Sequence, residues 1–216
     1  LRKKLDIIGI TDHNSTRQAG LVGMLGAREG LFVLQGAEVS TREEVHCLVF
    51  FENPAELELF QEYLDDNIPA VMNDPLIFGD QVVIDEKEYI IYTEEKLLTN
   101  ATNISIGELE KYVHARGGLF IPAHIDRVRT SIYSQLGFLP EDLNADALEV
   151  SKRSTPEKFS RIHPEIKAYP LITNSDSHYP ESIGTVYNCL EMKELSFGEI
   201  KMALKGIDGR RIRKKC

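Results

Sequence analysis

The sequence has no long hydrophobic stretch and no Cys-x-x-Cys motif, and both absences narrow the class of protein that it can encode. No apolar run approaches the roughly 20 residues that a membrane-spanning helix needs, and no signal peptide is visible. The three cysteines, Cys47, Cys189 and Cys216, show no Cys-x-x-Cys spacing. Cys47 and Cys189 lie inside apolar runs, so we expect core thiols, a reducing cytoplasmic setting and no membrane partner.

An excess of positive charge is also missing. The formal net charge is −9, from 25 Lys and Arg against 34 Asp and Glu. An acidic surface repels polyphosphate, so we expect no binding to long nucleic acid, although a small phosphorylated substrate or a short oligonucleotide is compatible with this charge. The basic segment 210–215 is predicted to be a solvated tail. The length fits one globular domain.

Four short apolar runs end in residues that can bind metals. Each run is short and followed by turn residues, as expected of a buried strand. The runs with their polar ends are Ile7–His13, Leu31–Glu38, Leu119–His124 and Tyr169–His178. Asp176 and His178 lie two residues apart, so in an extended segment they point to the same side. Strands that carry polar residues at their carboxyl ends are typical of a parallel α/β barrel.

The residues between these runs predict hairpins and capped helices. The polar bend 39–45 is too short for a parallel crossover, so the strand that follows should fold back and bring His46 beside Glu38. Asn53 and Pro54 predict the start of a helix over residues 53–66. Two capping boxes, Ser105–Glu108 and Ser196–Glu199, predict two more helices.

Residues 53–104 interrupt the alternation of strands and helices. Within this segment, residues 81–92 predict a second hairpin, with its turn at Asp85–Lys87. We interpret the whole segment as an insertion that lies beside or over the site.

The polar residues at the strand ends form one candidate site. Histidine and carboxylate ligands together suit Zn²⁺, Mn²⁺ or Fe²⁺. Each residue alone has an ordinary structural explanation, such as a helix cap, but one rim of a barrel accounts for all of them. His114 and His163 are expected on the surface. The candidate residues are Asp12, His13, Glu38, His46, His124, Asp176 and His178.

The same segments resemble the PHP (polymerase and histidinol phosphatase) family, and its stand-alone phosphoesterases in particular. The resemblance implies an α/β fold, a distorted (β/α)7 TIM-like barrel that residues 1–216 form as one domain with the inserted hairpin and helix segment. The segments that carry it, in the family's order and separation, are Gly9–Ser15, Gly36–Ser40, Val45–Leu48, Pro122–His124 and Asn174–His178.

The resemblance also implies a site for two or three divalent metal ions. Glu38 would bridge two ions; His46 and His124 would bind one of them, and Asp176 would bind the other.

His13 and His178 would bind a third ion, and Asp12 would support His13 from behind. The family's His-x-His motif on an N-terminal strand does not occur in this sequence. We therefore expect a native N-terminal strand before Leu1, and weak metal binding and little activity from this chain alone.

The predicted function is that of a metal-dependent phosphoric ester hydrolase. A small phosphomonoester, or the end of a short oligonucleotide, would be hydrolysed by metal-activated water, with Glu38 and Asp176 acting through the metals. Arg127 would hold a phosphate oxygen, because guanidinium pairs with phosphate through two hydrogen bonds. A surface salt bridge is the alternative role for Arg127, and the other basic candidates are Arg129, Lys152 and Arg153.

Two alternative functions remain open from the sequence. A metal-dependent amidohydrolase would share the barrel and the ligand types, but it usually needs a bridging lysine where this chain has Glu38. A catalytically silent metal-binding or regulatory domain would also have these residues. The sequence leaves the substrate, the metal and the oligomeric state undetermined.

Overall fold

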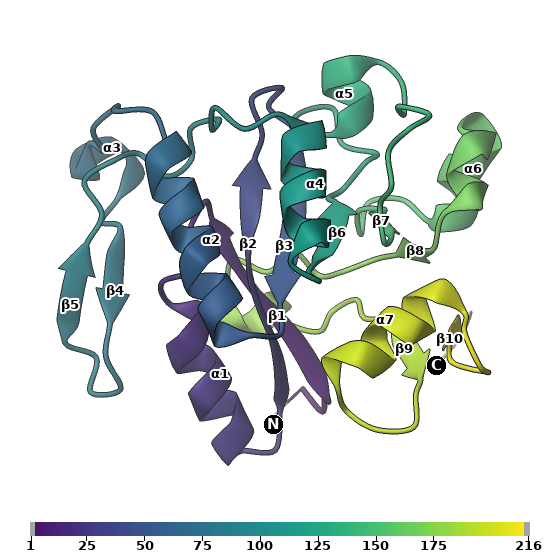
Figure 1. The fold of residues 1–216 in the computed structure, drawn as a ribbon, viewed down its shortest axis with the longest axis horizontal. Coiled ribbons are helices and arrows are strands. Elements are labelled where there is room, and N and C mark those ends of the chain that lie inside the picture. The colour runs from purple at the N-terminus through teal and green to yellow at the C-terminus, as the bar shows by residue number, and fades with distance from the viewer. Residues whose placement is uncertain (1–2, 214–216) are drawn as a thin grey trace.

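A four-stranded sheet forms the centre of the molecule (Figure 1). The computed structural model describes residues 3–213. The sheet order is β1-β2-β3-β6; β1 and β2 are parallel, whereas β3 is antiparallel to both of its neighbours. The predicted α/β class is therefore confirmed. The four strands are β1 (Ile7–His13), β2 (Phe32–Ser40), β3 (His46–Phe51) and β6 (Leu119–Pro122).

The β2–β3 hairpin makes the central sheet mixed rather than parallel. The bend after Ser40 is too short for a crossover, so β3 folds straight back, as predicted, and His46 pairs with Ser40 at the same end of the sheet as Glu38. The hairpin also requires a glycine in β2, because a Cβ at Gly36 would lie 1.7 Å from the carbonyl oxygen of Val49.

The other strands form short pairs and do not close a barrel. Within residues 3–213, the strands make one open sheet and three two-stranded pairs, so the predicted closed (β/α)7 TIM-like barrel is not confirmed. β7 and β8 are only two residues long each, too short to carry a hydrogen-bond ladder around a barrel. The pairs are β4 (Val82–Ile84) with β5 (Ile90–Thr93), β7 (Leu148–Glu149) with β8 (Leu171–Ile172), and β9 (Cys189–Glu191) with β10 (Arg211–Arg213).

Helices pack on both faces of the central sheet. The side chains of β3 alternate, so Val49 and Phe51 enter the core under α2 and α4, whereas Leu48 and Phe50 enter the core under α7. The α-helices are α1 (Ala19–Arg28), α2 (Pro54–Asn67), α3 (Pro75–Phe78), α4 (Ile106–Ala115), α5 (Ile132–Leu136), α6 (Pro156–Ile162) and α7 (Phe197–Lys205). Two 3₁₀ helices cover Pro164–Ala168 and Pro180–Ser182.

The predicted helix starts are mostly confirmed. Asn53 accepts a hydrogen bond from the Ala55 amide at 2.9 Å, and Ser105 and Glu108 form a complete capping box. The second predicted capping box, at α7, is only half right. Ser196 caps the helix, but the Glu199 carboxylate accepts the Lys193 amide at 2.8 Å instead of returning to Ser196.

The basic end of the chain is not a solvated tail up to residue 213. Arg210 is buried and its guanidinium donates to Glu199 at 2.7 Å, and Arg211–Arg213 forms β10 against β9. The run of cations was predicted to be a tail because the sequence alone does not show its partners on α7 and β9. Lys214 and Lys215 lie outside the described residues.

The cysteine prediction holds at one position. Cys47 is a buried free thiol, as expected. Cys189 is half-buried in β9 and disulfide-bonded, so the expectation of a core thiol there was wrong. Cys216 lies outside the described residues. No helix in the described part of the chain has the length and apolar character to cross a bilayer.

Candidate metal centre

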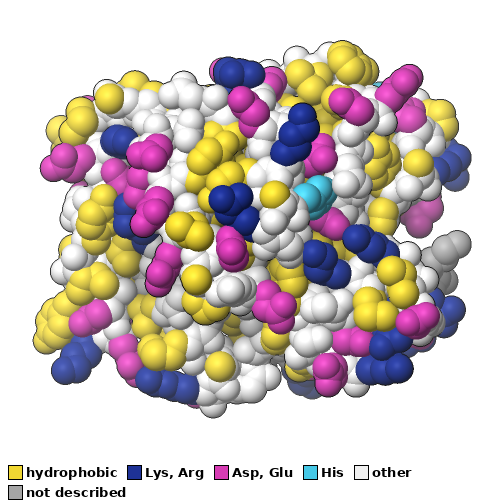
Figure 2. Space-filling view, viewed as in Figure 1, with side chains coloured by type: hydrophobic (Ala, Val, Ile, Leu, Met, Phe, Trp, Pro, Cys, Tyr) yellow, Lys and Arg dark blue, Asp and Glu magenta, His cyan; other side chains and the backbone are white. Residues whose placement is uncertain are grey.

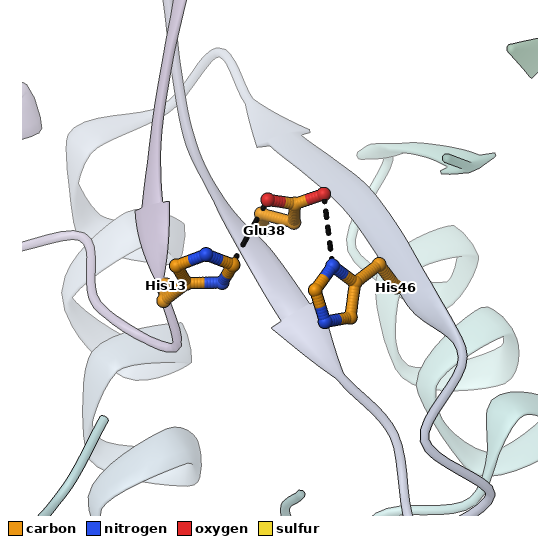
Figure 3. Close-up of side chains that lie close together, drawn as sticks. All are labelled: His13, Glu38 and His46. Atoms are coloured by element: carbon orange, nitrogen blue, oxygen red, sulfur yellow. Dashed lines mark hydrogen bonds and ion pairs between the residues drawn. The ribbon is translucent and has the colours of Figure 1, made fainter. Parts of the chain in front are cut away.

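The carboxyl ends of β1 and β2 and the start of β3 bring three potential metal ligands together. The parallel register pairs His13 with Glu38, and the hairpin register places His46 opposite Ser40, on the same side of the sheet as Glu38. Ligand atoms of His13, Glu38 and His46 all lie within 4.8 Å of one another. Figure 3 shows the Glu38 carboxylate between the two imidazole rings.

Glu38 is the centre of this cluster. Its Oε1 lies 3.2 Å from His46 Nδ1 and 3.1 Å from His124 Nε2. Its Oε2 lies 3.7 Å from His13 Nδ1. The three imidazole rings follow one another around the carboxylate, with His46 5.2 Å from each of the other two rings. The structure therefore brings three of the predicted histidine ligands around the carboxylate of a fourth predicted ligand, Glu38.

The electrostatics of the cluster favour metal binding at two of its residues, Glu38 and His13. Burial would raise the pKa of Glu38, but hydrogen bonds from His124 and His46 outweigh it and hold that pKa well below its ordinary value. Burial lowers the pKa of His13, against the opposing charge of Glu38. At neutral pH the centre thus offers an ionised carboxylate beside a neutral imidazole.

Two further predicted ligands lie together on the loop after β8. The Asp176 carboxylate forms an ion pair with Arg127, and His178 Nδ1 lies 3.8 Å from Asp176 Oδ1. The charges of Asp176 and His178 also act on the pKa of His13, so this loop faces the first cluster. The His178 side chain is 65% exposed, in contrast to the buried His124.

Several side chains anchor the Asp176 loop. Asn188 exchanges hydrogen bonds with the backbone of Thr173, at 3.0 Å in both directions. Lys152 Nζ donates to the carbonyl oxygen of Ser175 at 2.6 Å. The loop is therefore attached both to the segment before β9 and to the one after β7.

Asp12 precedes His13 at the end of β1, and its expected support of His13 stays a prediction. It is exposed on the opposite side of β1 from His13, and no hydrogen bond joins the two side chains within residues 3–213. Asn14 is the buried neighbour instead. Its Nδ2 donates to the carbonyl oxygens of Leu98 and Asn100, and its Oδ1 accepts the Ser40 amide at 2.9 Å. Asn14 thereby joins the site to the end of the segment 53–104.

Glu149 is a site residue that sequence reasoning missed. It is buried at the end of β7, and its Oε2 accepts the backbone amide of His124 at 3.0 Å. Burial raises the pKa of Glu149, and hydrogen bonds from the His124 amide and the Asn174 side chain oppose that shift. Glu149 thus connects a predicted ligand to the Asp176 loop. The available signal was a lone carboxylate inside the apolar run 147–150.

The two remaining histidines lie outside the centre, as predicted, but neither is a free surface residue. His114 Nε2 lies 3.0 Å from the buried Asp146 carboxylate, which joins α4 to the segment before β7. The His163 ring packs against Tyr133, with 4.0 Å between ring centroids. Both are accounted for by packing between helices and neighbouring segments.

A divalent cation fits the chemistry of the centre. Two imidazoles and one ionised carboxylate form a donor set that suits Zn²⁺, Mn²⁺ or Fe²⁺. The ring atoms His13 Nδ1 and His124 Nδ1 are both buried and have no hydrogen-bond partner within residues 3–213. Since buried polar atoms normally have partners, these two lone pairs are consistent with ligand positions.

This mixed α/β fold is shared by solved structures of enzymes that cleave nucleic acid. The chain is similar to the lesion-specific endonuclease PfuEndoQ from Pyrococcus furiosus, with a TM-score of 0.67 and 21% identity over 96% of this chain and 49% of that one. Endonuclease Q in complex with a 27-mer duplex substrate that has an abasic lesion at the active site also has a TM-score of 0.67, with 21% identity over 97% of this chain and 50% of that one. At this identity the similarity establishes the fold.

Two other proteins are similar to the chain. A proposed metal-dependent phosphoesterase from Bifidobacterium adolescentis has a TM-score of 0.56 and 18% identity over 86% of this chain and 83% of that one. In sequence, the uncharacterized protein YqxK of Bacillus subtilis (strain 168) is 28% identical over 190 residues, which are 83% of this chain and 43% of YqxK. The chain thus spans about half the length of YqxK and of endonuclease Q. No protein-family model matches it.

Proposed function

We propose that the chain is the metal-binding domain of a PHP-type phosphoesterase that cleaves phosphate esters of nucleic acid. One observation carries the proposal. Ligand atoms of His13, Glu38 and His46 lie within 4.8 Å of one another, and the Glu38 carboxylate is ionised at neutral pH. The fold shared with endonuclease Q and with the proposed phosphoesterase supports the same reaction class.

The residues of the site divide into two proposed groups of ligands. Glu38 would bridge two ions. His46 and His124 would form one group and bind the ion on one side of Glu38. Asp176 and His178 would form the other group and approach from the opposite loop, with His13 between the two groups. Bound divalent ions would polarise the phosphoryl group and lower the pKa of a water molecule at the site. The protein itself supplies a buried carboxylate that stays charged and, in His13, an imidazole whose pKa is lowered by burial.

The substrate proposal departs from the expectation based on net charge. Although the chain is acidic as a whole, three exposed cations, Arg129, Lys152 and Arg153, lie on the two loops next to the Asp176 loop. Such a local basic rim can bind phosphate despite the overall charge. Because endonuclease Q binds a duplex on the same fold, we include long nucleic acid among the substrates, beside short oligonucleotides and phosphomonoesters.

The proposal is tested by a hydrolysis screen with Mn²⁺ and with Zn²⁺. The substrates are p-nitrophenyl phosphate, bis-p-nitrophenyl phosphate, and labelled single-stranded and duplex oligonucleotides with and without an abasic site. The test variant is Glu38→Gln, which keeps the side-chain shape but removes the charge. The matched control is His114→Gln, a histidine that lies outside the centre.

We expect turnover that requires metal, disappears in Glu38→Gln and persists in His114→Gln. Hydrolysis of an amide substrate in place of a phosphoester would favour the amidohydrolase alternative. Stoichiometric metal binding without turnover of any substrate would favour a silent binding domain.

Arg127 is proposed to hold a substrate phosphate, and its ion pair with Asp176 adds a second proposed role, the orientation of Asp176. We expect Arg127→Ala to lower kcat/KM by about 10- to 100-fold, because the guanidinium both orients Asp176 and can pair with a substrate phosphate. Metal content separates the two roles. A loss of bound metal assigns Arg127 to the orientation of Asp176, and unchanged metal with a raised KM assigns it to the substrate. Wild-type kinetics with full metal would remove Arg127 from the site.

A further inference from the structure

The segment 71–92 exposes an unusual amount of apolar surface. Among the described residues, 21 large hydrophobic side chains are exposed, and ten of them fall in this segment. They include Leu76 at 97%, Ile77 at 71% and Ile91 at 65% exposure. Figure 2 shows hydrophobic side chains along the side of the molecule that α3 and the β4–β5 hairpin form, interspersed with charged ones. An apolar patch of this kind on a protein surface marks an interaction site more often than not.

The β4–β5 hairpin has an open strand edge beside this patch. Within residues 3–213, β5 pairs only with β4, and all four of its residues are exposed. The Glu94 amide donates to Gln81 and the Asp85 amide donates to Tyr89, both between β4 and β5. A register shift between Val83 and Ile84 interrupts the alternation, so the backbone groups of Thr93 and Ile90 face the other edge. An unpaired, apolar edge of this kind is a template for another strand.

The chain already uses part of that edge. Just beyond β5, the Leu97 amide donates to the Val71 carbonyl and the Asn73 amide donates to the Glu95 carbonyl, both on the side away from β4. An incoming strand beside Ile90 and Thr93 would therefore continue a ladder that the segment 71–73 begins. An open hollow of about 470 Å³ lies at this junction, between Met72 and Tyr92.

The charges around the edge define the partner. The segment 71–96 contains seven carboxylates and two lysines. Glu94 and Glu95 line the hollow, whereas Lys96 turns its ammonium away to the carbonyl oxygen of Asp65. A second copy of the same hairpin would place acidic residues against acidic residues, so charge complementarity favours a basic strand.

We infer that the free edge of β5 binds an extended segment of a partner protein, one that alternates apolar β-branched residues with lysine or arginine. Backbone hydrogen bonds to Ile90 and Thr93 supply the pairing, the exposed apolar side chains supply buried area, and Glu95 selects for positive charge. This surface is separate from the metal centre, so its function does not depend on catalysis.

The test measures binding of two short fluorescein-labelled peptides by fluorescence anisotropy. One alternates valine with lysine, and the other alternates valine with glutamate. The variant is Glu95→Lys, and the matched control is Glu141→Lys, an equally exposed charge reversal far from the hairpin. We expect the basic peptide to bind, Glu95→Lys to weaken it about three- to tenfold, and Glu141→Lys to leave it unchanged.

Amide exchange measured by NMR locates the peptide. The amides of Ile90 and Thr93 should exchange more slowly when the basic peptide is added, whereas amides of α4 should not change. Equal affinity for the two peptides, no binding of either, or no protection at Ile90 and Thr93 would overturn the inference. Self-association of the protein that is lost in Ile91→Lys would assign the edge to a second copy of the chain and would overturn it as well.

Discussion

At the scale of single residues, unusual backbone geometry coincides with the metal centre. Asn14, His124 and Asp176 all have positive φ, at 48°, 32° and 46°. Asparagine and aspartate tolerate this region, but histidine adopts it at a cost of about 1–3 kcal/mol. The structure sustains that cost at His124 because Glu149 accepts its amide hydrogen and Glu38 accepts from its ring.

This geometry makes Glu149 a positioning residue. Glu149→Ala should weaken Mn²⁺ binding by about 10- to 100-fold, because the His124 amide loses its acceptor. Glu149→Gln should restore most of the affinity, because the amide oxygen can still accept that hydrogen bond. Isothermal titration calorimetry measures both, with Glu141→Ala as the exposed control. If Gln and Ala reduce the affinity equally, the charge of Glu149 matters rather than its hydrogen bond.

At the scale of elements, the β2–β3 hairpin depends on Gly36. A Cβ at this position would meet the Val49 carbonyl oxygen, so Gly36→Ala must push the two strands apart. We expect a loss of about 1–3 kcal/mol or more in unfolding free energy, together with weaker metal binding as His46 moves away from Glu38. Urea denaturation measures the first effect.

The matched control for the hairpin is Gly107→Ala, because a Cβ on this glycine of α4 meets no atom within 4 Å. That substitution should be neutral or should stabilise the protein by up to about 1 kcal/mol. Equal changes in unfolding free energy for Gly36→Ala and Gly107→Ala would mean that the contact with Val49 does not restrict the side chain at position 36.

A second element contact joins α7 to the segment before β10. Hydrogen bonds from Arg210 and from the Lys193 amide lower the pKa of Glu199 from 4.5 to about 2. A carboxyl whose pKa is lower in the folded state stabilises the fold above its unfolded pKa, and it loses that contribution as the pH falls toward the folded value. The contribution of Glu199 is therefore complete above about pH 4.5 and is lost progressively toward pH 2.

Thermal unfolding between pH 6 and pH 2 tests this linkage. The difference in Tm between wild type and Glu199→Gln should be greatest near neutral pH and should shrink as the pH approaches about 2. A difference that is constant across this range would show that the pKa of Glu199 is the same in the folded and unfolded states.

At the scale of the whole molecule, a ligand that binds only the folded state stabilises every part of it. The centre joins β1, β2, β3 and β6, so metal binding should raise the Tm of the entire unit. At a metal concentration of about 100 times Kd the gain is about 2.7 kcal/mol, which corresponds to roughly 5–10 °C for a chain of this size. Differential scanning calorimetry with Mn²⁺ and with EDTA measures the shift. Glu38→Gln should abolish it, and an undiminished shift in that variant would place the metal elsewhere.

The sequence by itself determined the features that depend on near neighbours. The β2–β3 hairpin follows from the short bend after Ser40, the caps of α2 and α4 follow from side chains that bond within three residues, and the period of two along β3 divides its side chains between two cores. The residue types at the strand ends also identified His13, Glu38 and His46, because each stands where an apolar run meets polar residues. These features need only local hydrogen bonds and chain connectivity.

Only the tertiary structure decided which distant groups meet. Glu38 and His124 are 86 residues apart, Arg127 and Asp176 are 49 apart, and His124 and Glu149 are 25 apart. No local pattern encodes these contacts, so Glu149 was missed, the partner of Arg127 was not predicted, and Arg210 was taken for part of a tail. The open sheet in place of a closed barrel has the same origin, because closure depends on pairing between strands that are remote in the chain, and here β7 and β8 pair over two residues only.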